Sequence, residues 1–357
     1  MIQQWVFIEP HDVWMFRDSK PFTAGESFFA RSMFPPQPGT IQGMIRTHFY
    51  EHTQHIIGSS TSMGDLRITG AFLACKNGET VRRFYPMPLD VLATRPPRQL
   101  MPARSTKIVT DLGEDWRPLI SSDPLPSSDH KPEKDARYWL DEANFSRYLE
   151  GKPPAELTSE KELYGFEERT GLAIDYNRRA YRRRNTESPE GLFYRAAFVR
   201  PQPTMGLLIK VEYPDKVFTS DQGAIAVGGE SRMGNFTIVK YTPPAPRIEP
   251  GRIKLILLTP TYFTDGWQPS GGWSPWLGEK ARLVSAAIDK PQVFSGWDMV
   301  AGRPKTLRHF IPAGSVYYFE DAVLPTAPLT ETPKKEPDFG AIGYGAFAAA
   351  AWDYPTL

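Results

Sequence analysis

The chain has 357 residues, of which 40% are hydrophobic and 23% charged, and its formal net charge is +1. The near-zero charge excludes a bulk basic field, so any binding of nucleic acid depends on local basic patches. The single cysteine, Cys75, excludes an internal disulfide framework and fits a reducing cytoplasm. The first residues lack a signal-peptide pattern, and the most apolar segment, 341–352, is too short to span a bilayer. We therefore expect a globular, cytoplasmic protein that does not enter a membrane.

The first hundred residues predict a strand, a helix and two further strands. Residues 5–9 alternate as a strand does, and residues 41–57 have helical spacing with Thr40 as the cap. Residues 68–75 and 83–92 are strand-like. This order of elements is the first half of a ferredoxin-like unit. The 35 prolines, in a chain whose expected share is about 5%, predict short elements joined by ordered loops.

The predicted helix carries three histidines on its apolar face. Ile41, Met44, Ile45, Phe49 and Ile56 share this face with His48, His52 and His55, whereas Gln42, Arg46, Tyr50 and Thr53 lie opposite. Three histidines at this spacing are able to hold a metal ion, but histidines at the edge of a packed helix give the same pattern. The metalloprotease motif is absent from 48–52. We expect neither a metal nor a cofactor, and Arg46 either reaches a phosphate or is solvated.

Residues 111–165 differ in composition from their surroundings and predict an insertion in the first domain. Residues 121–129 are loop-like, and residues 136–149 have helical spacing. Further along, residues 178–184 contain five arginines and one tyrosine. Guanidinium groups suit the phosphates of a single RNA strand and an aromatic ring suits a base. The alternative is a solvated loop whose charges repel one another.

A glycine-rich bend at 225–234 follows two strand-like runs, 191–200 and 205–213. It reads Ile-Ala-Val-Gly-Gly-Glu-Ser-Arg-Met-Gly. Its glycines allow backbone amides to converge on an anion and its arginine supplies a planar charge, although an ordinary glycine turn has the same composition. The strand-like run at 236–241 and the absence of both nucleotide-loop motifs argue against an ATPase or a nicotinamide enzyme. A second glycine cluster, at 340–345, also borders apolar residues.

The last third of the chain predicts a second domain. The proline-rich residues 243–251 are the best candidate linker, so we place an N-terminal domain at 1–243 and a C-terminal domain at 244–357. Residues 253–259 and 316–319 predict strands, and residues 277–288 predict a helix. Trp267, Trp273 and Trp276 lie in one loop, where they either stack on bases or, as we expect, are buried.

A series of motifs, in order along most of the chain, resembles the RAMP superfamily of CRISPR-associated proteins. Within that superfamily the chain resembles the third subunit of the type III-B (Cmr) effector complex. Single motifs are weak, but their run is specific. They lie at 16–22 (Phe-Arg-Asp-Ser-Lys-Pro-Phe), 34–46, 86–90 (Pro-Met-Pro-Leu-Asp), 168–175, 190–194, 228–234, 295–299, 302–305, 311–319 and 340–345.

The resemblance implies an α+β fold of two ferredoxin-like, RRM-like domains with loop-rich insertions. It also implies a non-catalytic subunit of an antiviral complex that binds the 5′ repeat-derived tag of the guide RNA and docks the large palm-domain subunit. Backbone RAMP subunits of the same complex are further implied partners. The corresponding subunit of a type III-D complex has similar motifs and is an alternative.

A RAMP endoribonuclease that processes CRISPR repeat RNA is a second alternative. Such an enzyme needs a general acid or base, typically a histidine. His11 and His309 are the remaining candidates, because three histidines share the helix face and His130 lies in the insertion. On the RNA-binding interpretation the predicted contacts are Arg17, Lys20, Arg46, Arg169, Arg178, Arg179, Arg182, Arg183, Gly228, Gly229, Ser231, Arg232 and Gly234.

Overall fold

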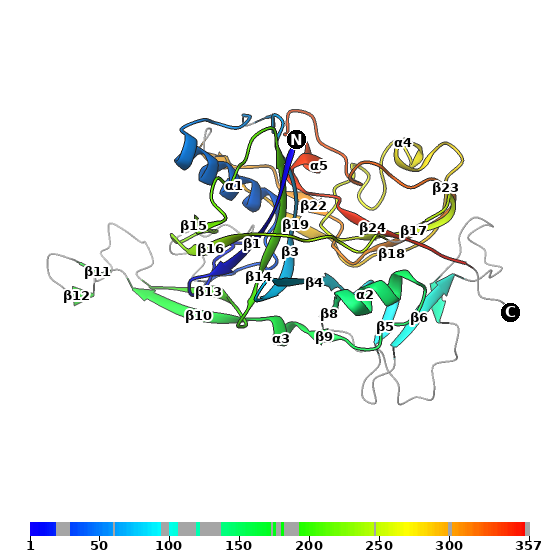
Figure 1. The fold of residues 1–357 in the computed structure, drawn as a ribbon, viewed down its shortest axis with the longest axis horizontal. Helices are drawn as coiled ribbons and strands as arrows, with labels where there is room; N and C mark the ends of the chain where they lie inside the picture. The colour runs from blue at the N-terminus through cyan, green and yellow to red at the C-terminus, as the bar shows by residue number, and fades with distance from the viewer. Residues whose placement is uncertain are drawn as a thin grey trace, which may run out of the picture.

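The computed structural model describes residues 1–18, 29–59, 61–93, 100–105, 119–121, 137–172, 174–175, 180–181, 193–245, 248–298 and 302–353. Strands arranged in several sheets dominate these residues, and a few helices accompany them (Figure 1). The fold is therefore mixed α+β, as the sequence predicts. Within these ranges no helix is both long enough and apolar enough to cross a membrane.

The largest sheet has eight strands in the order β15-β16-β1-β14-β3-β4-β8-β9. Strand β1 pairs antiparallel with both β14 and β16. Val6, Phe7 and Ile8 of β1 are all buried, so both faces of the sheet are covered there. The strands are β1 (Ile2–Pro10), β3 (Arg67–Asn77), β4 (Thr80–Pro86), β8 (Tyr138–Asp141), β9 (Thr158–Ser159), β14 (Met205–Tyr213), β15 (Gln222–Ala226) and β16 (Met233–Val239).

Helix α1 (Pro38–Thr53) lies against this sheet and differs in its ends from the prediction (Figure 1). Gln37, and not Thr40, holds the N-cap position, and Pro38 begins the helix, where a missing N–H costs nothing. Gln54 adopts a left-handed φ of 60° and ends the helix before residue 57. Ile56 is consequently exposed, and Gln42 is buried with its Nε2 3.1 Å from the Met63 sulfur. The predicted positions of these two side chains are therefore wrong.

A second sheet has the antiparallel order β18-β23-β17-β24 and corrects another helix prediction. Residues predicted as a helix at 277–288 instead form β18, which pairs with β23 from Arg282↔Glu320 to Ala287↔Val316. The sequence of β18 has no strong preference for helix or strand, so the pairing with β23 determines its conformation. The elements are β17 (Gly251–Leu257), β18 (Arg282–Ala287), β23 (Val316–Ala322), β24 (Phe347–Ala351), α4 (Ser274–Leu277) and α5 (Phe339–Ile342).

The segment predicted as a helix at 136–149 divides into a strand and a helix. Residues 138–141 form β8, and only α2 (Glu142–Leu149) is helical. Asp141 caps α2, because its carboxylate accepts the Asn144 N–H at 2.8 Å. Tyr138 and Trp139 are buried, so this part of the expected insertion belongs to the main sheet.

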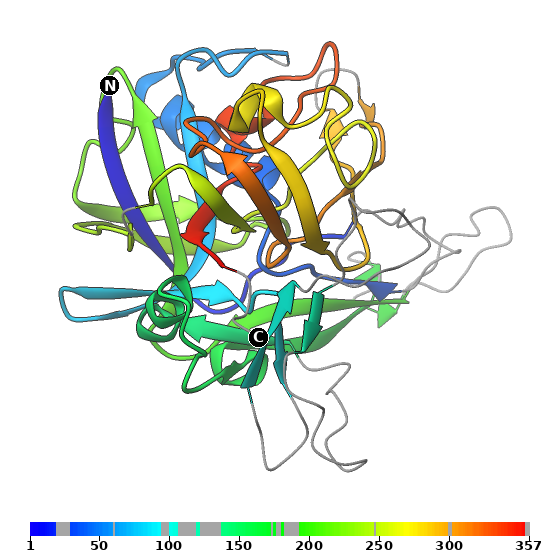
Figure 2. The same ribbon diagram turned by 90° about the vertical axis from the view of Figure 1, so that its right-hand side faces the viewer.

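The hydrophobic core is continuous across the two halves of the chain. Phe294, Phe310 and Phe339 share one cluster with Ile41 and Ile45 of α1. A second cluster joins side chains of β4 and α2 to side chains of β17 and β23. Figure 2 shows the second sheet, in yellow to red, beside the first. Trp273 is buried among aromatic side chains of the second half, which confirms the expectation for this tryptophan.

A buried polar cluster ties the halves together. Asp90, 1% exposed, accepts hydrogen bonds from the hydroxyls of Tyr148 at 2.8 Å and Tyr318 at 2.5 Å. Lys254 Nζ lies 3.6 Å from the same carboxylate. Burial lowers the pKa of Lys254, although Asp90 opposes this effect. Asp90 and Tyr148 come from the first half, and Lys254 and Tyr318 from the second.

A long hairpin extends from the molecule as an arm, formed by β10 (Tyr164–Leu172) and β13 (Phe193–Pro201) (Figure 1). Strand β2 (Phe29–Ala30) adds to β13 in parallel. The short pair β11 (Ile174–Asp175) and β12 (Ala180–Tyr181) lies beyond the hairpin end. The remaining elements are β5 (Val91–Ala93), β6 (Leu100–Ser105), β7 (Leu119–Ser121), α3 (Glu160–Leu163), β19 (Gln292–Phe294), β20 (Trp297–Asp298), β21 (Arg303–Pro304) and β22 (Arg308–Phe310).

Candidate nucleic-acid interface

The glycine-rich bend joins two strands, β15 and β16. The Val227 N–H donates to the Arg232 carbonyl at 2.8 Å and closes the bend. Glu230 and Ser231 both adopt left-handed backbone conformations within it, with φ of 57° and 51°. The strand that the sequence predicts after the bend is confirmed, so the bend is not the strand-to-helix loop of a P-loop or dinucleotide site.

Packing within the chain accounts for the glycines at 228 and 234. A Cβ on Gly228, where φ is +73°, would lie 2.3 Å from the Met15 carbonyl oxygen. A Cβ on Gly234 would lie 2.5 Å from the Glu9 carbonyl oxygen. The Gly229 N–H is already occupied, because it donates to the Met15 carbonyl at 2.8 Å. The bend therefore closes tightly on β1 and the segment after it, and this requirement exists without any ligand.

Arg232 is the cation that the bend presents. Its guanidinium carbon lies 4.6 Å from the centroid of the Phe198 ring on the arm. Its buried Nε has no hydrogen-bond partner, and no ion pair involves Arg232 among the described side chains. A stacked guanidinium whose charge is not neutralised is free to pair with a phosphate oxygen.

Arg169 lies over the same ring, with its guanidinium carbon 5.2 Å from the Phe198 centroid, but its charge is compensated. It donates to Asp12 at 2.8 Å and to Glu167 at 2.7 Å, and Arg200 bonds to the same two carboxylates. These bonds from Arg169 and Arg200 lower the pKa of Asp12, and in return raise the pKa of Arg169. The structure thus brings two predicted residues, Arg169 and Arg232, together, and leaves Arg232 as the more available charge.

The other face of the arm has a second arginine–aromatic stack, which the sequence analysis missed. The guanidinium carbons of Arg31 and Arg195 lie 5.5 and 5.6 Å from the centroid of Phe29. Arg195 also pairs with Glu168. Because successive strand residues point to opposite faces, Arg195 and Phe198 lie on opposite sides of the sheet. These residues are far apart in sequence and carry no motif, so only the β2–β13 pairing shows their proximity.

The other described residues of the predicted set are divided between two places. Arg17 is exposed, and it follows Met15, whose carbonyl accepts from the bend, by two residues. Ser231 is exposed at the bend itself. Arg46 lies on α1, where its guanidinium donates to the Ser59 carbonyl at 3.0 Å and burial lowers its pKa. Arg46 therefore has a structural partner outside the bend and the arm.

Five predicted contacts lie outside the described residues: Lys20, Arg178, Arg179, Arg182 and Arg183. The strands β10 and β13 on either side of the arginine-rich segment are described, and β13 lies beside the bend at Phe198. These five residues remain predicted RNA contacts.

The histidines of α1 differ from one another in their surroundings. His48 is buried, with ring centroids 4.7 Å from Phe218 and 5.2 Å from Phe236. Burial, aided by the nearby His52, lowers the pKa of His48 to about 4. His52 Nδ1 bonds to the His48 carbonyl at 2.8 Å, whereas His55 lies beyond the helix and is exposed. In the described part of the chain, no three His, Cys, Asp or Glu side chains gather as metal ligands do.

A family model and several solved structures match most of the chain. A model of the family described as CRISPR-associated protein (Cas_Cmr3) matches residues 6–352. Similar solved structures include a chain of the type III-B Cmr-beta complex bound to cognate target RNA and AMPPnP. It has 18% identity and a TM-score of 0.52, and the match covers 88% of this chain and 86% of that one. A chain of the same complex bound to cognate target RNA has 16% identity, a TM-score of 0.51 and the same coverage. No curated protein matches the sequence.

Proposed function

The chain belongs to the CRISPR-associated Cas_Cmr3 family, which confirms the resemblance seen in its motifs, and from this premise we propose that it is a type III-B effector subunit. In this proposal it binds the 5′ repeat-derived tag of the guide RNA and docks the large palm-domain subunit. It lies beside the backbone RAMP subunits and itself cleaves nothing. The fold shared with a chain of an RNA-bound Cmr-beta complex supports the proposal.

The observation that carries the RNA-binding part is the stack of Arg232 on Phe198. The bend is fixed by backbone contacts to Met15 and Glu9, so Arg232 is held in place before any RNA arrives. A preorganised guanidinium supplies the cation that single-strand binding needs for a phosphate, and the buried Phe198 ring holds that guanidinium in place. Phosphate contacts then fix the register of the strand, and contacts to bases give selectivity for the tag.

The strand orders also support two ferredoxin-like units. The four strands of the first unit are, in chain order, β1, β3, β14 and β16, and in the sheet they lie in the order β16-β1-β14-β3. The first strand is therefore flanked by the fourth and the third, and α1 connects the first strand to the second. In the second, β24-β17-β23-β18 has the same order, with α4 and α5 in the corresponding connections. The connection from β14 to β16 carries β15 where a ferredoxin-like unit has its second helix. We propose that both units belong to the RRM-like class, with β15 replacing the second helix of the first unit.

Purification of the chain with its neighbouring subunits, followed by sequencing of the bound RNA, tests the proposal. We expect guide RNAs that share one repeat-derived 5′ sequence, and we expect crosslinks between that tag and this chain. Guide RNA whose tag crosslinks only to other subunits would contradict the assignment. The identity of the co-purified subunits separates a type III-B complex from a type III-D complex.

A repeat-processing endoribonuclease is the alternative that the same material tests. His11 Nε2 bonds to the Asn235 side chain at 2.8 Å, and His309 is exposed on β22. We propose that neither acts as a catalytic acid or base. Incubation with repeat RNA should leave the RNA intact, and specific cleavage that His11→Ala or His309→Ala abolishes would establish the enzyme instead.

A further inference from the structure

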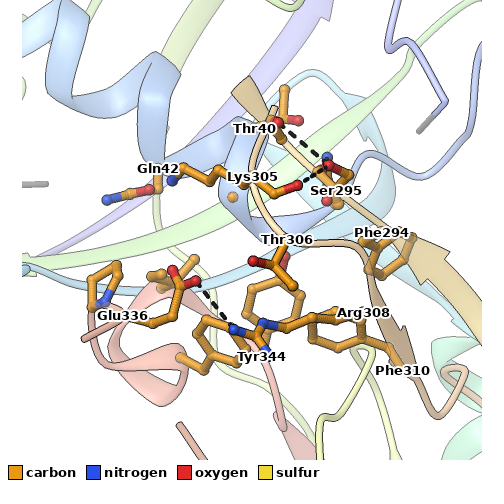
Figure 3. A pocket seen from close by; sticks show the side chains of 16 residues that line it. Thr40, Gln42, Phe294, Ser295, Lys305, Thr306, Arg308, Phe310, Glu336 and Tyr344 are labelled. Atoms are coloured by element: carbon orange, nitrogen blue, oxygen red, sulfur yellow. Dashed lines mark hydrogen bonds and ion pairs between the residues drawn. The ribbon is translucent and has the colours of Figure 1, made fainter. Parts of the chain in front are cut away.

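A pocket of about 230 Å³ lies at the seam between the two halves of the chain. Its walls come from the start of α1, the β19–β22 hairpin and the segment around α5 (Figure 3). Four of the segments that carry the family resemblance contribute to it, 34–46, 295–299, 302–305 and 340–345. The pocket is smaller than the roughly 300–1,000 Å³ of ordinary small-molecule sites, so it suits a single nucleotide unit and excludes a dinucleotide cofactor.

The floor of the pocket is aromatic. Phe294, Phe310 and Tyr344 line it, and the Phe310 ring centroid is 5.0 Å from that of Phe294 and 4.7 Å from that of Tyr344. All three rings are buried in the core shared by the two halves, so they form a rigid surface. An apolar aromatic surface of this kind can pack against a nucleobase.

Hydrogen bonds fix the rim of the pocket. The side-chain amide of Gln37 donates to the Ser295 carbonyl at 3.0 Å, which joins the start of α1 to the second half. The Ser295 hydroxyl donates to the Lys305 carbonyl at 2.8 Å, and the Lys305 N–H donates to the Gly296 carbonyl at 2.8 Å. The backbone at Lys305 is therefore held at the mouth of the pocket without a ligand.

One positive charge at this rim is not neutralised. Arg308 pairs with Glu336 at 3.3 Å, whereas Lys305 has no acidic partner among the described residues. The Lys305 stem packs over Gly296, where a Cβ would lie 3.5 Å from Lys305 Cδ, an ordinary van der Waals contact. Figure 3 shows Lys305 and Thr306 at the rim, with Phe294, Phe310 and Tyr344 among the lining side chains.

We infer that this pocket receives a nucleoside phosphate, as one nucleotide of the bound RNA strand. The phosphate pairs with the Lys305 ammonium, the Thr306 hydroxyl and the Gln37 amide lie beside the ribose, and the base rests against the aromatic floor. The inference deepens the proposed function and rests on it, because it adds a second contact to the RNA, separate from Arg232. The same chemistry admits a free nucleotide, so the test has an arm for each source.

The test uses the assembled complex and guide RNA with its 5′ tag. Lys305→Glu reverses the charge at the rim, and Thr306→Trp fills the mouth without changing charge. We expect each to weaken RNA binding about tenfold, and Lys305→Glu to reduce the salt dependence by about 0.7, the value for one phosphate of a single strand. Lys280→Glu, the same charge reversal at an exposed lysine outside the pocket, is the control and should bind as the unchanged chain does.

The outcomes separate this inference from the function on which it rests. If the unchanged complex binds tagged RNA, and Lys305→Glu binds it as tightly as Lys280→Glu, the pocket is not part of the RNA site while the proposed function stands. If the complex holds guide RNA without any contact from this chain, the proposed function itself fails. If 5′-AMP binds, Lys305→Glu abolishes that binding and RNA affinity is unchanged, the pocket serves a free nucleotide and the RNA assignment is overturned.

Discussion

The two glycine-rich segments, 228–234 and 340–345, look alike in sequence but differ in what they do for the molecule. Both allow close approach of backbones: Gly228 to the Met15 carbonyl, and Gly343 to the Gly70 carbonyl of β3. The terminal segment is almost wholly buried, and the Thr259 hydroxyl donates to the Gly343 carbonyl at 2.8 Å. The bend, in contrast, leaves Gly228 and Ser231 exposed and carries Arg232. Glycine clusters therefore mark tight packing in both places, and the neighbouring arginine distinguishes the segment that we propose binds RNA.

The largest expected effect is at the buried segment. Gly343→Ala adds a Cβ 2.9 Å from the Gly70 carbonyl oxygen at a φ of +115°, across the seam between the halves. We expect the free energy of unfolding to fall by about 2–5 kcal/mol, from backbone strain and overpacking together. Chemical denaturation of the variant and the unchanged chain measures this difference in the free energy of unfolding. Gly78→Ala, at a φ of +59° with no atom within 4 Å, isolates the strain and should cost about 1 kcal/mol. Equal losses for the two variants would mean that the seam relaxes freely.

The next effect is at the bend. Gly228→Ala places a Cβ 2.3 Å from the Met15 carbonyl oxygen, and we expect a loss of about 2–3 kcal/mol because this clash adds to the strain of a positive φ. Gly229→Ala is the matched control, since its nearest contact is 3.7 Å and its φ is not positive. Thermal unfolding of both variants checks the difference. If Gly229→Ala is the more damaging, the Met15 contact does not account for the glycine at 228.

Acid should weaken the bend side of the molecule. The pKa of His48 is lowered to about 4, from 6.5, because its ring is buried against Phe218, in the connection from β14 to β15, and Phe236 of β16. Neutral His48 therefore stabilises the fold fully above pH 6.5, and this contribution is lost as pH falls from 6.5 to 4, by about 1–3 kcal/mol. Denaturation across this range should show a shallower dependence for His48→Gln than for the unchanged chain. If the free energies of unfolding of the two proteins fall in parallel with pH, a group other than His48 causes the loss.

For Arg232→Ala we expect the smallest loss of stability, together with a clear loss of RNA binding. Loss of the stack on Phe198 costs about 0.5–1 kcal/mol of stability. We expect RNA affinity to fall about fivefold to tenfold, with a salt dependence reduced by about 0.7. Filter binding at several salt concentrations checks this, and Arg232→Lys should keep the salt dependence while losing the stack. A stability loss with unchanged affinity would make Arg232 a packing residue like the glycines.

Local patterns predicted most of the strands, because alternation and β-branched residues mark them directly. Residues 205–213 form β14 with the predicted bounds. The failures have tertiary causes: 282–287 become a strand because β23 pairs with them, and 138–141 because β4 does. At the candidate site, the motif marks Arg232, but the ring beneath it, Phe198, lies 34 positions earlier in the chain and is brought there by folding. The compensation of Arg169 by Asp12 was invisible for the same reason.

The Asp90 cluster limits how such a chain can be divided or exchanged. A fragment that ends near residue 243 would retain Asp90 and Tyr148 but lose Lys254 and Tyr318, and it would leave a carboxylate beside an uncovered apolar surface. For recombination, as for folding, the two halves are therefore a single unit: we expect a chimaera to keep its fold only when the partners of Asp90 from both halves stay together.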